Sequence, residues 1–206
     1  MDAKLTRGDE MMKQTKLDST EDVTIVEQLD LKSASNIAEM VITQVDAWCE
    51  KIEVVGSIRR CRPFVHDIDF VVLPKKADSW NMLRKTVLTM MDTKPIFKQG
   101  DQVIRALLAL ESSEYVQIDF YRCTPENYGS IKLMRTGSAE HNIWLAKLAI
   151  KSGLRWLHTK GLCKGDQVIA GSDERLIFSS LAFYYVEPTE REIVNGEPMW
   201  WKNERV

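Results

Sequence analysis

Three acidic residues in two apolar segments are the strongest chemical signal in the sequence. Asp67 and Asp69 flank Ile68 at the start of one apolar run, and Asp119 lies in a second run. Because side chains alternate along a strand, Asp67 and Asp69 should share one face while Ile68 points to the other. If the second run forms a neighbouring strand, Asp119 completes a cluster of three carboxylates.

Such a cluster requires a counter-charge. Carboxylates a few ångströms apart raise one another's pKa unless a cation neutralises them. Oxygen ligands with open coordination positions suit Mg²⁺ that is shared with substrate phosphates. The spacing alone leaves a second interpretation open, in which the three acids are solvated side chains on the polar face of a sheet.

A short basic turn precedes the first pair of acids and bears on this choice. Gly56 and Ser57 end a predicted strand and lead directly into Arg59 and Arg60. Backbone N–H groups, a hydroxyl and a guanidinium would then converge on an anion beside the acids. A glycine-serine turn with two arginines is by itself usually an ordinary solvated loop. Its position just before the acidic strand favours a triphosphate-binding loop.

Length and composition limit the class of protein. The chain has 206 residues, 44% of them hydrophobic, which is enough for a core without stabilising disulfides. Lys and Arg number 28 against 30 Asp and Glu, which argues against a disordered chain or a uniformly basic one. The four cysteines are too far apart for a CxxC pair, so we expect free thiols. No signal peptide or membrane span is evident, and we expect a cytoplasmic, nucleoid or viral location.

The pattern of apolar residues predicts the elements that position these groups. Helices are expected over 33–50, 79–91, 125–134, 139–150 and 173–183, and strands over 52–57, 67–74, 103–110, 115–121, 154–157 and 167–170. Asp78 should cap the second helix, and Thr124 followed by Pro125 should start the third. This order predicts an α+β fold with a mixed β-sheet and helices on one face, followed by a small helical/β subdomain. We expect weak order or a short lead-in strand over 1–33, and subdomains over 34–122 and 123–206.

Taken together, the motifs resemble a known signature. The run Gly56-Ser57-Ile58-Arg59-Arg60, followed by Asp67-Ile68-Asp69, resembles the nucleotidyltransferase signature of the X family of DNA polymerases. The resemblance covers roughly residues 34–192 and continues, in the family's order, through Gln117-Ile118-Asp119-Phe120, Thr136-Gly137-Ser138, Asn142 and the run from Tyr185 to Arg191. Many nucleotidyltransferases share the first element. The Thr-Gly-Ser turn that opens a helix carrying Asn142 is more specific to the polymerases.

The resemblance implies a role for each of these positions. It implies a catalytic palm over 34–122 and a thumb over 123–206. Asp67, Asp69 and Asp119 would hold two Mg²⁺ ions, or Mn²⁺ as a substitute, with Asp119 nearest the primer 3′-hydroxyl. The nucleotide would be bound by Gly56, Ser57, Arg60, His66, Thr136, Gly137, Ser138 and Asn142. Such an arrangement agrees with two-metal chemistry, in which no side-chain nucleophile is needed.

Two further features bear on the substrates. Met134 and Arg135 stand where template-directed members of the family usually carry an aromatic pair, so we expect partial ribonucleotide insertion. Lys147, Lys151 and Arg155 recur every four residues and predict a basic stripe along the helix after Asn142. Such a stripe can follow a DNA backbone, although a solvated helix face is the simpler alternative.

The expected function is that of a monomeric DNA polymerase of the X family. It would add nucleotides from nucleoside triphosphates to the 3′-hydroxyl of primer-template or gapped DNA, filling short gaps in repair with low processivity. Alternatives are a nucleotidyltransferase acting on RNA, protein or a small molecule, a template-independent terminal transferase, and a catalytically silent nucleic-acid-binding module. The segment from Thr136 to Asn142 argues against another acceptor, and the presence of all three acids argues against a silent module.

Overall fold

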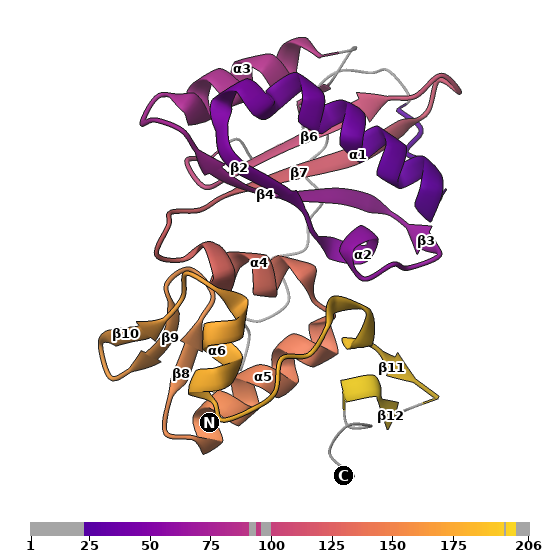
Figure 1. Cartoon of the computed structure of the whole chain (residues 1–206). Coiled ribbons are helices and arrows are strands. Elements are labelled where there is room, and N and C mark those ends of the chain that lie inside the picture. The colour runs from indigo at the N-terminus through magenta and orange to yellow at the C-terminus, as the bar shows by residue number, and fades with distance from the viewer. Residues whose placement is uncertain (1–22, 91–93, 96–99, 196, 201–206) are drawn as a thin grey trace, which may run out of the picture.

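The computed structural model describes residues 23–90, 94–95, 100–195 and 197–200 (Figure 1). Its helices are α1 (Leu31–Val45), α2 (Gly56–Arg59), α3 (Ser79–Thr89), α4 (Tyr128–Thr136), α5 (Ala139–Lys151) and α6 (Glu174–Ser180), with 3₁₀ turns η1 (Asp46–Trp48) and η2 (Pro188–Glu190). Its strands are β1 (Leu29–Asp30), β2 (Cys49–Val54), β3 (Phe64–Val65), β4 (Asp67–Pro74), β5 (Lys94–Pro95), β6 (Val103–Ala109), β7 (Tyr115–Arg122), β8 (Arg155–Leu157), β9 (Gly161–Lys164), β10 (Gln167–Ala170), β11 (Ile193–Val194) and β12 (Glu197–Pro198).

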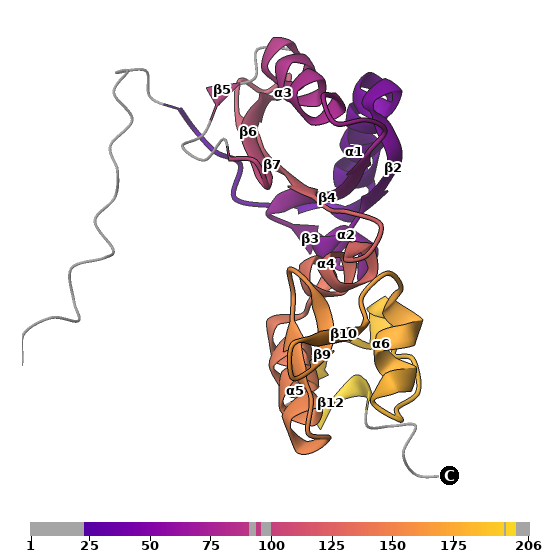
Figure 2. The same ribbon diagram turned by 90° about the vertical axis from the view of Figure 1, so that its left-hand side faces the viewer.

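A five-stranded sheet forms the core of the first lobe. Its strand order is β2-β4-β7-β6-β5, with β4 parallel to β7 and the other neighbours antiparallel. Figures 1 and 2 show α1 and α3 on the same side of this sheet. Ile68, Phe70 and Phe120 are fully buried in the cluster that these helices cover, and the rings of Phe70 and Phe120 stack with centroids 4.9 Å apart. The predicted α+β class, mixed sheet and alternation around Ile68 are confirmed.

The first helix begins and ends earlier than the sequence predicts. Asp30 caps it by accepting hydrogen bonds from the Ser33 N–H at 3.0 Å and the Ser33 hydroxyl at 2.6 Å. The helix ends at Val45, and β2 has already begun at Cys49, so the predicted extension to residue 50 is wrong. Pairing of β2 with β4 provides hydrogen bonds for this backbone, and that tertiary contact outweighs the apolar period that continues to Trp48.

The predicted start of the third helix is also wrong. Thr124 does not cap it; instead the Thr124 N–H donates to Asn127 Oδ1 at 2.7 Å and closes a turn. The helix α4 begins three residues after Pro125, at Tyr128. Asp78 does precede α3 as predicted, but its side chain makes no capping hydrogen bond there.

The second lobe packs α5 and α6 against the antiparallel sheet β10-β9-β8. The central strand β9 was not predicted, because its residues do not alternate in polarity. Gly161 starts this strand at φ +130°, and a Cβ there would overlap the Ala170 carbonyl oxygen. Trp200 is buried among the aromatic side chains of this lobe. Trp201 lies outside the described residues.

A separate apolar cluster joins the two lobes. It contains Val55, Val71 and Tyr121 from the first lobe and Tyr128 and Ile131 from α4. The boundary between 122 and 123 stays a prediction, as does the tail over 1–33, of which residues 1–22 lie outside the described part. All four cysteines are free. In the part of the chain that the structure describes, no helix is both long enough and apolar enough to cross a membrane.

Candidate functional site

The pairing of two parallel strands brings the three predicted acids together. Strands β4 and β7 pair in a register that sets Asp69 opposite Asp119 and Asp67 opposite Gln117. Asp67 and Asp69 are partly exposed, whereas Ile68 between them is fully buried. The expectation that Asp119 lies on a strand next to that of Asp67 and Asp69 is confirmed. The catalytic role of the three acids stays a prediction.

Asp119 is held by an arginine that sequence reasoning missed. Arg105 lies directly opposite it on β6, and the Arg105 Nε donates to the two carboxylate oxygens at 2.8 and 3.0 Å. The Tyr121 hydroxyl donates to the same carboxylate at 2.9 Å. The Asp119 side chain is 1% exposed and that of Arg105 36%. Asp119 therefore directs its oxygens toward a cation that belongs to the chain itself.

Burial and mutual repulsion shape the acidity of the other two acids. Burial, followed by the charges of Asp67 and Asp119, raises the pKa of Asp69 to about 7. Burial and the charge of Asp119 also raise the pKa of Asp67. A divalent cation relieves such repulsion, and carboxylate oxygens are the donors that Mg²⁺ prefers, so the chemistry of the donor set fits. In the arrangement observed, no three acidic, histidine or cysteine side chains among the described residues are placed to hold one ion.

The turn before the acids is helical rather than a loop. Gly56 to Arg59 form the single turn α2, so the loop predicted there is wrong. Gly56 has φ +61°, and a Cβ at this position would overlap Asp69 Oδ2, so only glycine lets the turn lie against the acid. The Val55 N–H donates to the Asp69 carbonyl at 2.9 Å. Ser57 Oγ is shielded from solvent and has no hydrogen-bond partner in the described part of the chain.

Arg60 connects this turn with the second lobe. Its Nη1 donates to the Thr136 carbonyl oxygen, and its Nε donates to Glu192 Oε1 at 2.6 Å. Gly137 has φ +73°, and a Cβ there would lie 3.1 Å from Arg60 Nη1. The fold therefore brings Arg60 beside the Thr136–Ser138 turn, although Thr136 is 76 residues distant from Arg60 in the sequence.

The turn between α4 and α5 has clear structural roles. Ser138 caps α5 by accepting a hydrogen bond from the His141 N–H at 3.3 Å. Thr136 Oγ1 accepts from Arg59 and donates to the Lys132 carbonyl at 2.7 Å. The side-chain amide of Asn142 donates to the Met134 carbonyl at 2.8 Å, while its Oδ1 is shielded without a partner among the described residues. Asn142 therefore keeps an acceptor that its own fold does not use.

The remaining predicted residues lie at the margins of this site. His66 is exposed and immediately precedes Asp67 on β4. The Arg135 guanidinium stacks on the Tyr121 ring, 3.7 Å from its centroid, so this residue connects α4 with the sheet.

The predicted basic stripe does not follow a single helix. Lys147 and Lys151 are exposed on α5, but that helix ends at Lys151 and Gly153 turns the chain with φ +71°. Arg155 is exposed on β8 instead, so its assignment to the helix is wrong.

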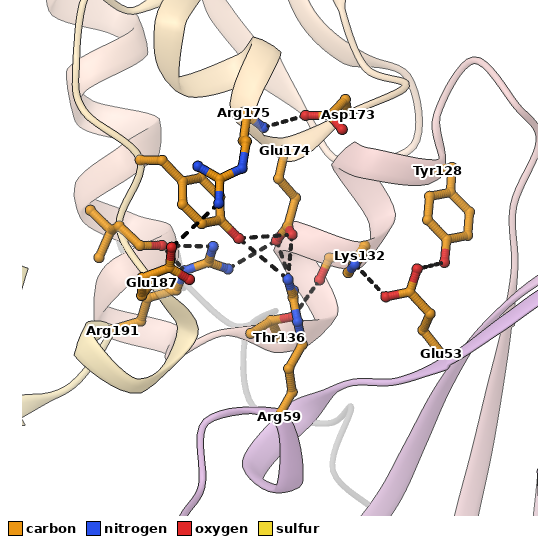
Figure 3. Close-up of polar contacts among 12 residues, drawn as sticks. Glu53, Arg59, Tyr128, Lys132, Thr136, Asp173, Glu174, Arg175, Glu187 and Arg191 are labelled. Carbon is orange, nitrogen blue, oxygen red and sulfur yellow. Dashed lines mark hydrogen bonds and ion pairs between the residues drawn. The ribbon is translucent and has the colours of Figure 1, made fainter.

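A buried ionic network, also missed from the sequence, joins the two lobes (Figure 3). The Arg59 guanidinium donates to both carboxylate oxygens of Glu174, at 2.9 and 2.5 Å. The Arg191 Nη1 donates to the same carboxylate at 3.0 Å. The side chain of Arg191 is 0% exposed and that of Glu174 6%. These residues are far apart in the sequence, and no local pattern indicates that they pair.

Comparison with known proteins finds similarity to DNA polymerases. A model of the DNA polymerase beta thumb matches residues 132–192. The DNA polymerase/3′-5′ exonuclease PolX of Bacillus subtilis is 29% identical over 105 residues, which cover 51% of this chain and 18% of that protein. DNA polymerase IV of Saccharomyces cerevisiae is 34% identical over 77 residues, which cover 37% of this chain and 13% of that protein. The chain is a relative of the X-family DNA polymerases.

A solved structure shows the same fold. The polymerase beta of Leishmania infantum, crystallised as a ternary P/T complex, superposes with a TM-score of 0.71 at 16% identity. The match covers 82% of this chain and 78% of that one. The resemblance to the X family and the α+β fold are thus confirmed. The matched segments span less than a fifth of the length of the Bacillus and Saccharomyces polymerases.

Proposed function

We propose that this X-family relative is a metal-dependent DNA polymerase that extends a DNA 3′-hydroxyl, filling short gaps in repair with low processivity. One observation carries the proposal. The β4–β7 register sets Asp69 opposite Asp119, while the Gly56 turn lies against Asp69 and Arg60 lies against Gly137. These contacts support a site in which the acids would hold metal ions beside a turn for the phosphates and a turn for the nucleotide. The polymerase names of the relatives and the P/T complex of the structural neighbour support DNA as the acceptor.

The side chains of the first lobe have two roles in this proposal, metal binding and triphosphate binding. Asp67, Asp69 and Asp119 would hold the divalent ions, which supply a lower pKa for the attacking hydroxyl and neutralise charge on the leaving pyrophosphate. Ser57 Oγ, which lacks a partner in the described fold, and the Arg60 guanidinium bind the triphosphate. Because phosphoryl transfer depends mainly on positioning and electrostatics, no covalent nucleophile is required.

Residues of the second lobe position the nucleotide and the DNA. Gly137 has no Cβ and permits a sugar to approach the backbone closely. The free Oδ1 of Asn142 accepts a hydrogen bond from the edge of the base. His66, exposed beside Asp67, lines the path of the phosphates. Lys147 and Lys151, exposed on α5, and Arg155 on β8 contact the DNA backbone.

The test is extension of a labelled primer on one-nucleotide-gapped, open-template and single-stranded DNA, with Mg²⁺ or Mn²⁺. We expect templated addition, fastest on the gapped substrate. Asp119→Ala should lower the single-turnover rate by about 10³-fold, equivalent to about 4 kcal/mol in the barrier. The matched control Asp166→Ala changes an exposed acid between β9 and β10 and should leave the rate unchanged.

The other outcomes point to other functions. Untemplated tailing of single strands would indicate a terminal transferase. Binding of the metal and triphosphate without extension of any DNA would indicate an RNA, protein or small-molecule acceptor. DNA binding without triphosphate binding would indicate a silent binding module.

A further inference from the structure

The Arg60 guanidinium already binds a carboxylate of the chain itself. Glu192 Oε1 accepts from Arg60 Nε at 2.6 Å, and both side chains are largely buried, at 15% and 16% exposed. Arg62 Nε lies 3.8 Å from the same oxygen, on a side chain that is 46% exposed. The Glu192 carboxylate therefore lies between two guanidinium groups, which is an environment that also suits a phosphate oxygen.

The backbone that carries Glu192 is anchored on both sides. The Arg191 carbonyl accepts from the Ser138 N–H at 3.3 Å, and the Glu192 carbonyl accepts from the Met199 N–H at 2.9 Å. The Arg191 side chain is fully buried, and its Nε and Nη2 donate to the Val186 carbonyl at 3.0 and 2.9 Å. The Glu192 carboxylate can thus leave Arg60 by rotating its side chain, without movement of its backbone.

Arginine presents the same donors to carboxylates and to phosphates. Arg60 Nη1 is already engaged with the Thr136 carbonyl, and Glu192 takes the Nε. A triphosphate that reaches Arg60 at the Nε must therefore displace the Glu192 carboxylate. Because that carboxylate is tethered beside Arg60, it can return as soon as the phosphates leave.

We propose that Glu192 competes with phosphate groups for Arg60, and so weakens the binding of nucleoside triphosphate and of product pyrophosphate by a similar factor. The inference rests on the proposed function, since it takes Arg60 as a triphosphate ligand. Competition at the phosphates is independent of the base, and it favours release of pyrophosphate after each addition. Glu192 is in this sense an affinity-determining residue that acts through Arg60.

The experiment is equilibrium binding with Mg²⁺ present. The probes are a fluorescent, non-hydrolysable deoxynucleoside triphosphate and inorganic pyrophosphate as its competitor. Glu192→Gln removes the charge and should lower the Kd of both probes by about tenfold, the size expected when one charge-assisted hydrogen bond no longer competes. Glu187→Gln is the matched control, because it makes the same change in net charge. The Glu187 side chain is 55% exposed and pairs with Arg175 instead. This variant should alter both values by less than about twofold.

A second variant guards against a folding defect. Glu192→Asp keeps the charge but shortens the side chain, so its Kd values should lie between those of the wild type and Glu192→Gln. Thermal unfolding of each variant identifies any that is not folded. Equal affinities in the folded variants, or weaker binding by Glu192→Gln, would overturn the competition while leaving the proposed function intact. Failure of every variant, wild type included, to bind triphosphate would overturn both.

Discussion

Arg59 and Arg60 are adjacent in the sequence and equally exposed, at 16% each, yet they have different kinds of partner. Arg59 binds Glu174, which is 6% exposed and is also bound by the fully buried Arg191 (Figure 3). Arg60 binds Glu192, which is 15% exposed at the edge of the candidate site. A buried carboxylate shared by two arginines is costly to unpair, whereas a carboxylate at a site edge can be exchanged for a ligand. The burial of the partner carboxylate, rather than that of the arginine, therefore distinguishes a structural role from a binding role.

Stability measurements on two alanine variants test this difference most strongly. Arg59→Ala should lower the free energy of unfolding by about 3–5 kcal/mol, because it leaves the buried Glu174 with only one of its two cations. Arg60→Ala should lower it by less, about 1–2 kcal/mol, since it removes the hydrogen bond to the Thr136 carbonyl while Glu192 keeps Arg62 and some contact with solvent. Urea unfolding provides both values. Equal losses in the two variants would contradict the distinction.

The stability of the folded protein should also depend on pH, because a histidine is buried near Arg191. His141 is fully buried, and burial, followed by the charge of Arg191, lowers its pKa to about 2. The unfolded chain takes up this proton below pH 6.5, while the folded chain does not, so stability present above that pH is lost as the pH falls.

Between pH 8 and pH 5 the loss should be about 2 kcal/mol. The variant His141→Phe, which fits the surrounding aromatic side chains, should lack this component. Its stability relative to wild type, followed by urea unfolding from pH 8 to pH 5, isolates the histidine from the carboxylates. Parallel pH profiles for the two proteins would rule out a buried neutral His141.

Arg105 offers an intermediate case, since it is partly exposed but its partner Asp119 is not. Its hydrogen bond to Asp119 raises the pKa of Arg105, so the cation persists at every working pH. The variant Arg105→Met removes this cation and should leave Asp119 free to bind metal. We expect its Kd for Mn²⁺, measured by calorimetry, to be lower by about tenfold. Arg175→Met, which changes a 68% exposed arginine, is the control. Weaker Mn²⁺ binding by Arg105→Met would show instead that Arg105 orients Asp119 for the metal.

The smallest effect is expected on the exposed face of α5. Replacing Lys147 and Lys151 together by alanine should reduce the slope of log affinity for DNA against log salt concentration by about 2. Lys32 and Lys85, exposed on α1 and α3, form a control pair whose replacement should leave the slope unchanged. An unaltered slope in the first double variant would remove α5 from the DNA interface.

The acids could be predicted because strand alternation is a local property. Asp67 and Asp69 alternate with buried residues along β4 as the sequence indicates. The contact between Arg105 and Asp119 could also have been predicted from the sequence. A short turn joins β6 and β7, so pairing Ala109 with Tyr115 sets Arg105 opposite Asp119.

Other features depend on contacts that no local pattern encodes. Pairing of Arg59 with Glu174 spans 115 residues, and the order of the two lobes alone does not specify it. The end of α1 is set by the pairing of β2 with β4 rather than by the apolar period. The position of Arg155, by contrast, follows a local signal, because Gly153 adopts a left-handed conformation that ends α5 and the strand predicted over 154–157 contains Arg155.

The central distinction is tested most directly by a structure of the protein with Mg²⁺ and a non-hydrolysable deoxynucleoside triphosphate. We predict phosphate oxygens on Arg60 in place of Glu192, with the Arg59–Glu174 pair unchanged. A nucleotide bound while Arg60 still holds Glu192, or an Arg59 released from Glu174, would contradict the account.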